Sequence, residues 1–227
     1  MAITTFPHGP LTQLASNLWV VTAPTSQGLD RKMSVARGRD GALLLYDDLW
    51  LDEPTFAQLD ALGPVAVIFV PSYLHDFDGE RFAQRYPKAR LCGSRATVQK
   101  LRWKGMVEFE PSMAPAGVVV EPIPGVARAE MVGRVQHPEG GESLVFSDAL
   151  FNIPREKAGL ITRLMGSAGP LHMSPLGRLF LLKDRKAFHE YLEAQSRRDD
   201  LRHLVVGHGE VISKDVNLAL AGAAARL

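Results

Sequence analysis

Hydrophobic positions in the first part of the chain form short, β-branched runs. These runs are residues 18–22 (LWVVT), 32–37 and 42–46 (ALLLY), and an Arg-Asp-Gly turn separates the last two. Short apolar strands joined by Asp-Gly turns are typical of an antiparallel meander. We therefore expect the chain to open with a meander of strands.

The pattern changes to alternating helices and strands between residues 54 and 93. Residues 54–62 have apolar positions at helical spacing, with proline at the start and Gly63 directly after the end. Residues 65–70 (VAVIFV) are continuously apolar, which is typical of a strand covered on both faces. Residues 79–86 then predict a helix, and residues 90–93 predict a short strand.

The second half repeats this order of strands followed by helices. The sequence predicts strands at 117–123, 130–136, 143–147 and 204–206, helices at 184–197 and 215–227, and an insertion over one face at 154–182. The turn between the second and third of these strands contains His137, which we expect to face solvent. Two halves of this kind predict two sheets packed face to face with helices outside, in a single domain spanning residues 1–227.

Composition narrows the classes of partner. The 227 residues carry a net charge of +1 and are 46% hydrophobic, which favours neither nucleic acid nor an acidic membrane surface as the main partner. Cys92 is the only cysteine, so no internal disulfide forms. The first ten residues lack the features of a secretory signal, and no apolar run is long enough to span a bilayer. We expect a cytoplasmic protein with a small-molecule substrate or ligand and no membrane partner.

Four short motifs follow one another along the chain. They are residues 71–79 (PSYLHDFDG), 123–126 (IPGV), 144–151 (LVFSDALF) and 205–210 (VVGHGE). In order and approximate spacing they resemble the metal-binding motifs of the metallo-β-lactamase superfamily, T-H-x-H-x-D-H-x-G, T-P-G-H, G-D-x-L-F and G-H-G. The resemblance implies an α/β (α+β) protein with the αβ/βα four-layer sandwich of that superfamily.

The resemblance also implies where the two metal subsites of the family would lie. The first would use Ser72, Leu74, Val126 and the bridging Asp148. Leucine and valine have no donor atom and neutral serine is a poor ligand, so we expect this subsite to be lost. Three of the four positions of this subsite, all except Asp148, are therefore degenerate.

The second subsite would use Asp76, Phe77, Asp148 and His208, of which only phenylalanine lacks a donor. Two carboxylates and one imidazole suit one divalent zinc, manganese or iron ion. Asp76 and Asp148 are then also the expected catalytic residues. A shift of one residue in the loop would bring His75 or Asp78 into the site instead, which we consider the less favoured arrangement.

Each of these three donors also has a purely structural interpretation. Asp76 is a common turn residue, Asp148 could cap the following turn, and His208 could only hydrogen-bond across the sandwich. Two buried carboxylates without a metal would need another counter-charge, for which Arg178 is one candidate.

The replacements change the character of the pocket. Ser72, Leu74, Phe77 and Val126 would point into the former metal cavity and make it partly apolar. Such a cavity could take a small organic ligand or be filled by its own side chains.

Three functions remain open at this stage. The first is a hydrolase with one metal that acts on an ester, lactone or thioester. The second is a catalytically inactive, metal-free member of the superfamily that binds a small ligand or has a regulatory role. The third is a scaffold that uses the apolar segment 154–182 to bind a partner, with a homodimer as one form of that contact.

Overall fold

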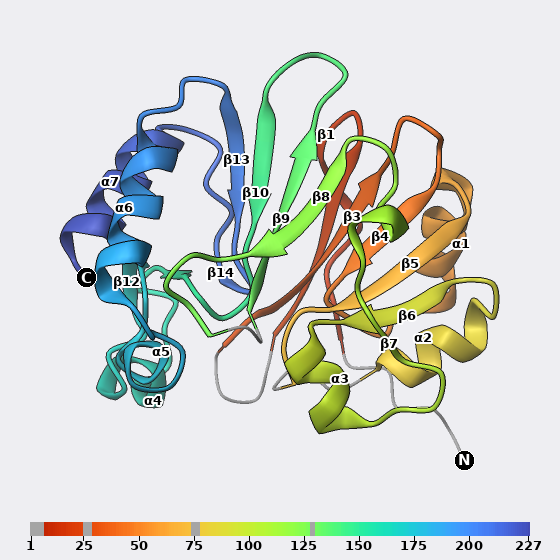
Figure 1. Cartoon of the computed structure of the whole chain (residues 1–227), viewed down its shortest axis with the longest axis horizontal. Coiled ribbons are helices and arrows are strands. Elements are labelled where there is room, and N and C mark those ends of the chain that lie inside the picture. The colour runs from red at the N-terminus through yellow and green to blue at the C-terminus, as the bar shows by residue number, and fades with distance from the viewer. Residues whose placement is uncertain (1–6, 25–28, 74–77, 128–129) are drawn as a thin grey trace.

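The computed structural model describes residues 7–24, 29–73, 78–127 and 130–227. Four layers lie side by side in Figure 1: the helices α6 and α7, the smaller of the two main sheets, the larger sheet, and the helices α1, α2 and α3. The helices are α1 (Glu53–Leu62), α2 (Gly79–Arg85), α3 (Arg95–Leu101), the 3-10 turn η1 (Pro111–Met113), α4 (Leu160–Leu164), α5 (Pro175–Phe180), α6 (Arg185–Ser196) and α7 (Val216–Ala225).

The larger sheet has seven strands in sequence order. They are β1 (Thr12–Ala15), β2 (Leu18–Ala23), β3 (Arg31–Arg37), β4 (Leu43–Tyr46), β5 (Val65–Val70), β6 (Arg90–Gly93) and β7 (Val107–Glu108). Strands β1 to β4 pair antiparallel, which confirms the predicted meander, and β4 to β7 pair parallel. Crossovers through α1, α2 and α3 make the parallel pairing sterically feasible.

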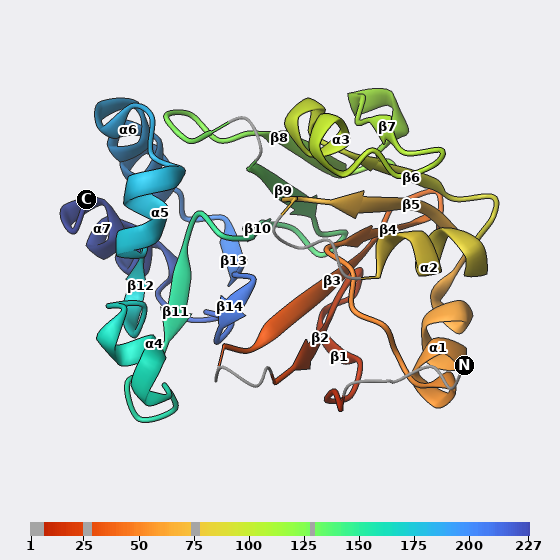
Figure 2. The same cartoon turned by 90° about the horizontal axis from the view of Figure 1, so that it is seen from below.

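The second sheet has four strands in the order β13-β10-β9-β8, and a small third sheet has the order β12-β11-β14. Their bounds are β8 (Val118–Pro122), β9 (Met131–Gln136), β10 (Glu142–Val145), β11 (Phe151–Ile153), β12 (Gly169–His172), β13 (Leu201–Val205) and β14 (His208–Gly209). Strands β10 and β13 pair parallel, so the segments that follow them leave at the same edge of the sheet. Figure 2 looks at this edge from below.

Strand alternation explains the continuously apolar run 65–70. Val67 and Phe69 belong to the cluster between the two sheets. Ile68 and Val70 belong to the cluster under α1 and α2. Because successive side chains of a strand point to opposite faces, a strand covered on both sides needs apolar residues at every position. The predicted two-sided burial of this strand is confirmed.

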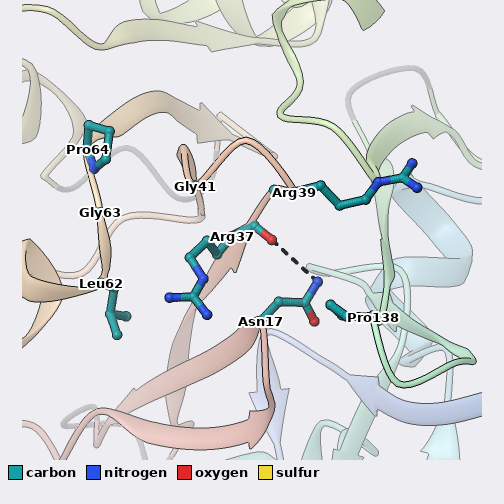
Figure 3. Close-up of a pocket in the computed structure, with 9 residues that line it drawn as sticks. Asn17, Arg37, Arg39, Gly41, Leu62, Gly63, Pro64 and Pro138 are labelled. Carbon is teal, nitrogen blue, oxygen red and sulfur yellow. Dashed lines mark hydrogen bonds between the residues drawn. The ribbon is translucent and has the colours of Figure 1, made fainter.

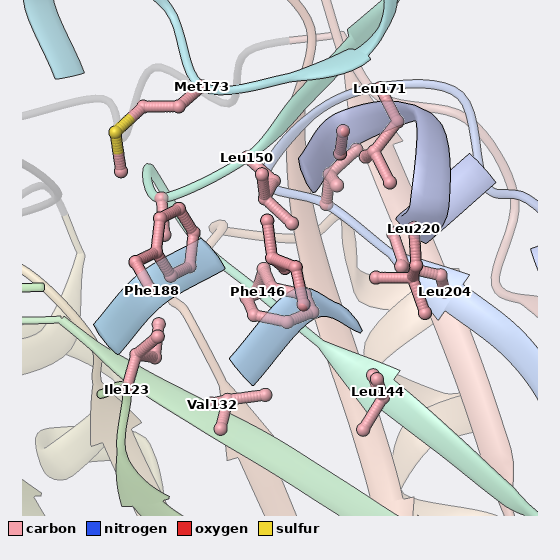
Figure 4. Close-up of a cluster of buried hydrophobic side chains, with 14 of the residues drawn as sticks. Ile123, Val132, Leu144, Phe146, Leu150, Leu171, Met173, Phe188, Leu204 and Leu220 are labelled. Carbon is pink, nitrogen blue, oxygen red and sulfur yellow. The ribbon is translucent and has the colours of Figure 1, made fainter. Parts of the chain in front are cut away.

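A third cluster fills the space between the four-stranded sheet and the helices α6 and α7 (Figure 4). Phe146, Phe188, Leu204 and Leu220 are fully or almost fully buried there. Val126 belongs to the same cluster. The C-terminal half therefore has a core of its own on the outer side of its sheet, which we call the C-terminal cluster.

Most predicted elements are present, and the differences fall in short elements and in one turn. The elements that the sequence did not predict are β1, α3, β7, η1, β11, α4, β12, α5 and β14, each of seven residues or fewer. The prediction that His137 faces solvent is wrong. Its ring is buried, with Nδ1 2.6 Å from Asn17 Oδ1 and Nε2 2.7 Å from Ser143 Oγ, so the hairpin turn folds back onto the protein. Within the described ranges, no helix combines the length and apolar character that crossing a bilayer requires.

Candidate functional site

A carboxylate and an imidazole meet at the lower edge of the second sheet. Asp148 follows β10, His208 opens β14, and Asp148 Oδ1 lies 3.1 Å from His208 Nε2. Both side chains are only about a tenth exposed, at 11% and 12%. The ring of Phe151 packs against that of His208, with centroids 4.8 Å apart. The parallel pairing of β10 with β13 brings these distant parts of the sequence together.

The backbone of Asp30 fixes the orientation of the His208 ring. His208 Nδ1 lies 2.8 Å from the carbonyl oxygen of Asp30. A carbonyl only accepts hydrogen bonds, so Nδ1 carries the proton and donates it. In the neutral ring the lone pair is then on Nε2, which points at Asp148 Oδ1. A lone pair and a carboxylate oxygen at this distance repel each other unless a proton or a cation lies between them.

A second buried carboxylate supports Asp148. The backbone N–H of Asp148 donates to Glu130 Oε2 at 3.1 Å, and Glu130 is fully buried. Sequence reasoning treated Glu130 only as the first residue of a strand and missed this role. A charged residue placed directly before an apolar strand is the signal that could have identified it, because acidic residues are rarely buried without a specific partner.

Two glycines allow the backbone to bring His208 into position. Gly209 has φ +100°, and a Cβ there would overlap the carbonyl oxygen of Asn152 on β11. At Gly207 a Cβ would lie 3.2 Å from the carbonyl oxygen of Ser147. Close approach of two backbones thus explains the G-H-G motif, because Gly209 leaves no room for a side chain and Gly207 leaves little.

A buried cation lies on the neighbouring strand. Strand β3 contacts β14, and on β3 Lys32 is 5% exposed with its Nζ 3.0 Å from Thr22 Oγ1. Burial lowers the pKa of Lys32 to about 8, against the opposing effect of the charges of Asp30 and Glu210. Arg178, the cation considered from the sequence, instead contacts the backbone carbonyl of Arg226 on the surface.

The described positions of the first metal subsite are part of the protein interior. Val126 is 8% exposed, packs in the C-terminal cluster and forms an isolated β-bridge with Leu182. Ser72 is 1% exposed. Leu74, together with the loop residues discussed below, lies outside the described residues.

Asp78 has the contacts of a loop anchor. Its carboxylate accepts hydrogen bonds from the backbone N–H of Trp50 at 3.0 Å and from Arg81 at 2.8 Å. Its own backbone N–H donates to the buried carboxylate of Asp48. Burial, and next the charge of Asp47, raise the pKa of Asp48 to about 8. This network fixes the start of α2 directly after the motif loop.

The residues present suit a metal only in part. Among the described residues, no group of three histidine, cysteine, aspartate or glutamate side chains could hold a metal ion. Asp148 and His208 supply one oxygen and one nitrogen 3.1 Å apart. Two ligands of one tetrahedral zinc ion lie roughly 3.3 Å apart, so this spacing fits. A third donor would have to come from residues 74–77, where His75, Asp76 and Phe77 lie outside the described residues.

A cavity of about 570 Å³ lies at the opposite edge of the sandwich (Figure 3). Asn17, Arg37, Arg39 and Pro138 are among the residues that line it, and Asn17 Nδ2 donates to the carbonyl oxygen of Arg37 at 3.4 Å. Its lining contains no carboxylate or imidazole. The Asp148–His208 pair is therefore the better candidate for chemistry.

Comparison with solved structures places the fold among metallo-β-lactamases. A metallo-β-lactamase from Pontibacter korlensis is similar with a TM-score of 0.62 and 14% identity, covering 96% of this chain and 99% of that chain. An enzyme of the same kind from Erythrobacter litoralis gives a TM-score of 0.63 and 16% identity, with 96% of each chain covered. The FIM-1 metallo-β-lactamase of Pseudomonas aeruginosa, in its mono-zinc form, gives 0.62 and 14%, covering 98% of this chain and 96% of that chain.

The sequence itself matches no protein-family model and no curated protein. The likeness thus lies in the architecture, and it confirms the four-layer αβ/βα sandwich expected from the motifs.

Proposed function

From the metallo-β-lactamase fold of this chain, we propose that it is a hydrolase-like protein with a single metal subsite that acts on an ester, lactone or thioester. Asp76, Asp148 and His208 would hold the metal. The observation that carries the proposal is the pair formed by Asp148 Oδ1 and His208 Nε2, 3.1 Å apart, with Nδ1 of the histidine committed to a backbone carbonyl. Zinc, manganese and ferrous ions all accept this donor set.

The residues of the chain have separate tasks in this proposal. A bound metal would supply Lewis acidity and lower the pKa of a water molecule. The carbonyl of Asp30 holds the His208 ring in the tautomer whose Nε2 is a ligand, as metal-binding histidines usually require. Glu130 holds the backbone of Asp148 in place, so that its carboxylate need not reorganise when a cation arrives.

The similar FIM-1 structure in a mono-zinc form supports the idea that this architecture holds one metal. In the present chain the first subsite offers Ser72 and Val126, which are buried and poor in donors. The reaction would therefore proceed with one metal at the second subsite.

The test is a hydrolysis assay on the full chain, supplied in turn with zinc, manganese and ferrous iron. Aryl ester, lactone and acyl thioester substrates should be compared in the wild type, Asp148→Asn, His208→Ala and His203→Ala. His203 is a matched control, because it is a half-buried histidine on β13 whose Nδ1 contacts Ser213 Oγ at 2.8 Å. Metal-dependent turnover that disappears in Asp148→Asn and His208→Ala but persists in His203→Ala would support the proposal.

The second candidate is a metal-free module that binds a small ligand or has a regulatory role. The burial of Val126 within the C-terminal core favours it, because an apolar core residue then stands where a two-metal site would need a ligand. Asp148 and a protonated His208 would then form an ion pair. Absence of turnover with every substrate and metal, in a correctly folded wild type, would favour this candidate and overturn the first.

A further inference from the structure

The helices α4 and α5 expose an unusual concentration of hydrophobic side chains. Of the ten large hydrophobic side chains exposed among the described residues, seven lie between residues 160 and 180. Leu164 is 78% exposed, Leu179 70% and Phe180 63%. We call residues 154–186 the α4–α5 surface. Scattered exposed hydrophobic residues are normal, whereas a concentration of this kind marks an interaction site.

The two helices form one continuous region. A Cβ on Gly166, just after α4, would lie 3.0 Å from Cγ of Pro175, the first residue of α5. Both helices lie at the same end of the molecule in Figures 1 and 2. The other side of this segment is ordinary core, because Leu171 and Met173 are buried. The exposed residues are therefore the outer face of a well-packed segment.

The α4–α5 surface is also strongly basic. Its residues include seven arginines and lysines against two acidic residues, a net charge of +5 in a chain whose total is +1. All nine charged side chains are exposed. Ion pairs within the described residues join Lys157 to Glu210 and Lys186 to Glu190.

Two arginines border a depression beside α4. Arg155 and Arg163 line it together with Glu156, Gly166 and Ala168, and its volume is about 690 Å³. No described acidic side chain forms an ion pair with Arg155 or Arg163. Guanidinium groups at the edge of an apolar helix provide donors for the phosphate of a lipid headgroup while neighbouring leucines contact acyl chains.

Two occupants of this surface can be compared, a second copy of the chain and a lipid bilayer. The combination of positive charge and exposed apolar side chains favours one of them. In a symmetric dimer the same patch would face its own copy, which would bring together two surfaces that remain positively charged, at +3, after Glu210 and Glu190 are counted. An anionic bilayer has the opposite charge and an apolar interior a few ångströms below its headgroups. We propose that the α4–α5 surface docks this protein onto the surface of an anionic lipid bilayer, without spanning it and independently of any hydrolytic activity.

The proposal extends the sequence analysis in one respect. No membrane partner was predicted, because the net charge of the whole chain is only +1 and no run could span a bilayer. Docking through one exposed basic surface requires neither a high total charge nor a spanning run. Of the alternatives left open for the segment 154–182, the proposal takes that of a binding surface, with a lipid occupant in place of a second copy.

The test is co-sedimentation of the full chain with two kinds of vesicle. One is made of phosphatidylcholine alone, and the other contains phosphatidylcholine with one third phosphatidylglycerol. We expect at least tenfold tighter binding to the anionic vesicles, which weakens as salt is raised. Leu164→Glu and the double variant Arg155→Gln/Arg163→Gln should each weaken binding at least tenfold. Leu218→Glu, at a leucine 65% exposed on α7 outside the surface, is the matched control and should bind as the wild type does.

Three results would overturn the proposal. The first is absence of binding to the anionic vesicles. The second is binding that Leu164→Glu and Leu218→Glu reduce equally. The third is a stable dimer in sedimentation velocity that Leu164→Glu converts to monomer, which would assign this surface to a second copy of the chain. Circular dichroism of each variant verifies that it is folded.

Discussion

The two halves of the candidate site differ in chemical character: one is apolar and the other is polar. On the side of the first metal subsite, Val126 stands where a ligand is expected and packs in the C-terminal hydrophobic cluster. On the side of the second subsite, Asp148 and His208 remain polar, adjacent and oriented. Val126 is thus part of the core, whereas Asp148 and His208 have a spacing that fits the proposed ligand pair.

The two sides differ in the contacts that surround them. Around Val126 these are the contacts of ordinary hydrophobic packing. Around Asp148 and His208 they are hydrogen bonds to polar groups, since the carbonyl of Asp30 orients His208 and Glu130 holds the backbone of Asp148. Buried polar supports are costly when they serve no partner, so their presence agrees with a polar function at this edge.

The apolar half can be tested through its core. Phe188 of α6 is fully buried in the cluster that contains Val126. Phe188→Ala should lower the free energy of unfolding by about 3–5 kcal/mol, because it removes a large buried side chain and leaves a cavity. Urea denaturation measures this change. Leu218→Ala on the exposed face of α7 should change stability by less than about 0.5 kcal/mol. Equal effects of the two substitutions would contradict the assignment of this side to the core.

The buried cation beside the polar half, Lys32, should make the stability of the protein depend on pH. The pKa of Lys32 is lowered from 10.5 to about 8 by burial, so the unfolded chain binds the proton more tightly than the folded protein does. Between pH 8 and 10.5 the wild type should therefore gain stability as pH rises, by up to about 3 kcal/mol. Below pH 8 Lys32 is protonated in both the folded and the unfolded state, so the folded protein bears the full cost of burying the charge. Above pH 10.5 the group is neutral in both states and this cost is absent.

Lys32→Met removes this group and should lack the gain. The free energy of unfolding of both proteins is measured by urea denaturation at pH 7.5 and about pH 10. Subtracting the value of the variant from that of the wild type at each pH cancels the contributions of the other titrating groups. Parallel pH profiles of the wild type and Lys32→Met would show that the ammonium group is not penalised by burial.

A third test places a histidine at position 126, where the resemblance to the superfamily leads us to expect a metal ligand. Val126→His places an imidazole in a position that is 8% exposed and surrounded by apolar side chains. It should lower the free energy of unfolding by about 1–3 kcal/mol through burial of a polar group, without adding a metal. Val126→Leu is the control for a change of size alone. A second tightly bound metal in Val126→His would mean that the first subsite is still intact in outline.

Periodicity and boundary signals were sufficient to predict the longer elements. The strand 65–70 and the helix at 54–62 were recognisable because one is buried on both faces and the other carries proline and glycine at its ends. Strands such as β14, with two residues, carry no pattern of their own and form only because the neighbouring strand β11 pairs with them. The same holds for His137, whose burial depends on Asn17, 120 positions earlier in the sequence.

The site was predictable to the extent that its residues lie in motifs. Asp148 and His208 could be paired from the order of the motifs, and the structure places them together. Glu130, Asp30 and Lys32 could not be found in this way, because their roles depend on which strands are neighbours. Asp76, the proposed third ligand, lies outside the described residues and remains a prediction.

The most direct test of the account is the number of metal ions bound per chain. The protein should be purified without chelator, supplied separately with zinc, manganese and ferrous iron, desalted, and analysed by inductively coupled plasma mass spectrometry beside Asp148→Ala. The account predicts one equivalent of metal in the wild type and none in Asp148→Ala, with both proteins folded. Two equivalents in the wild type would contradict the expected loss of the first subsite. Absence of metal under every condition would contradict metal binding at the second subsite.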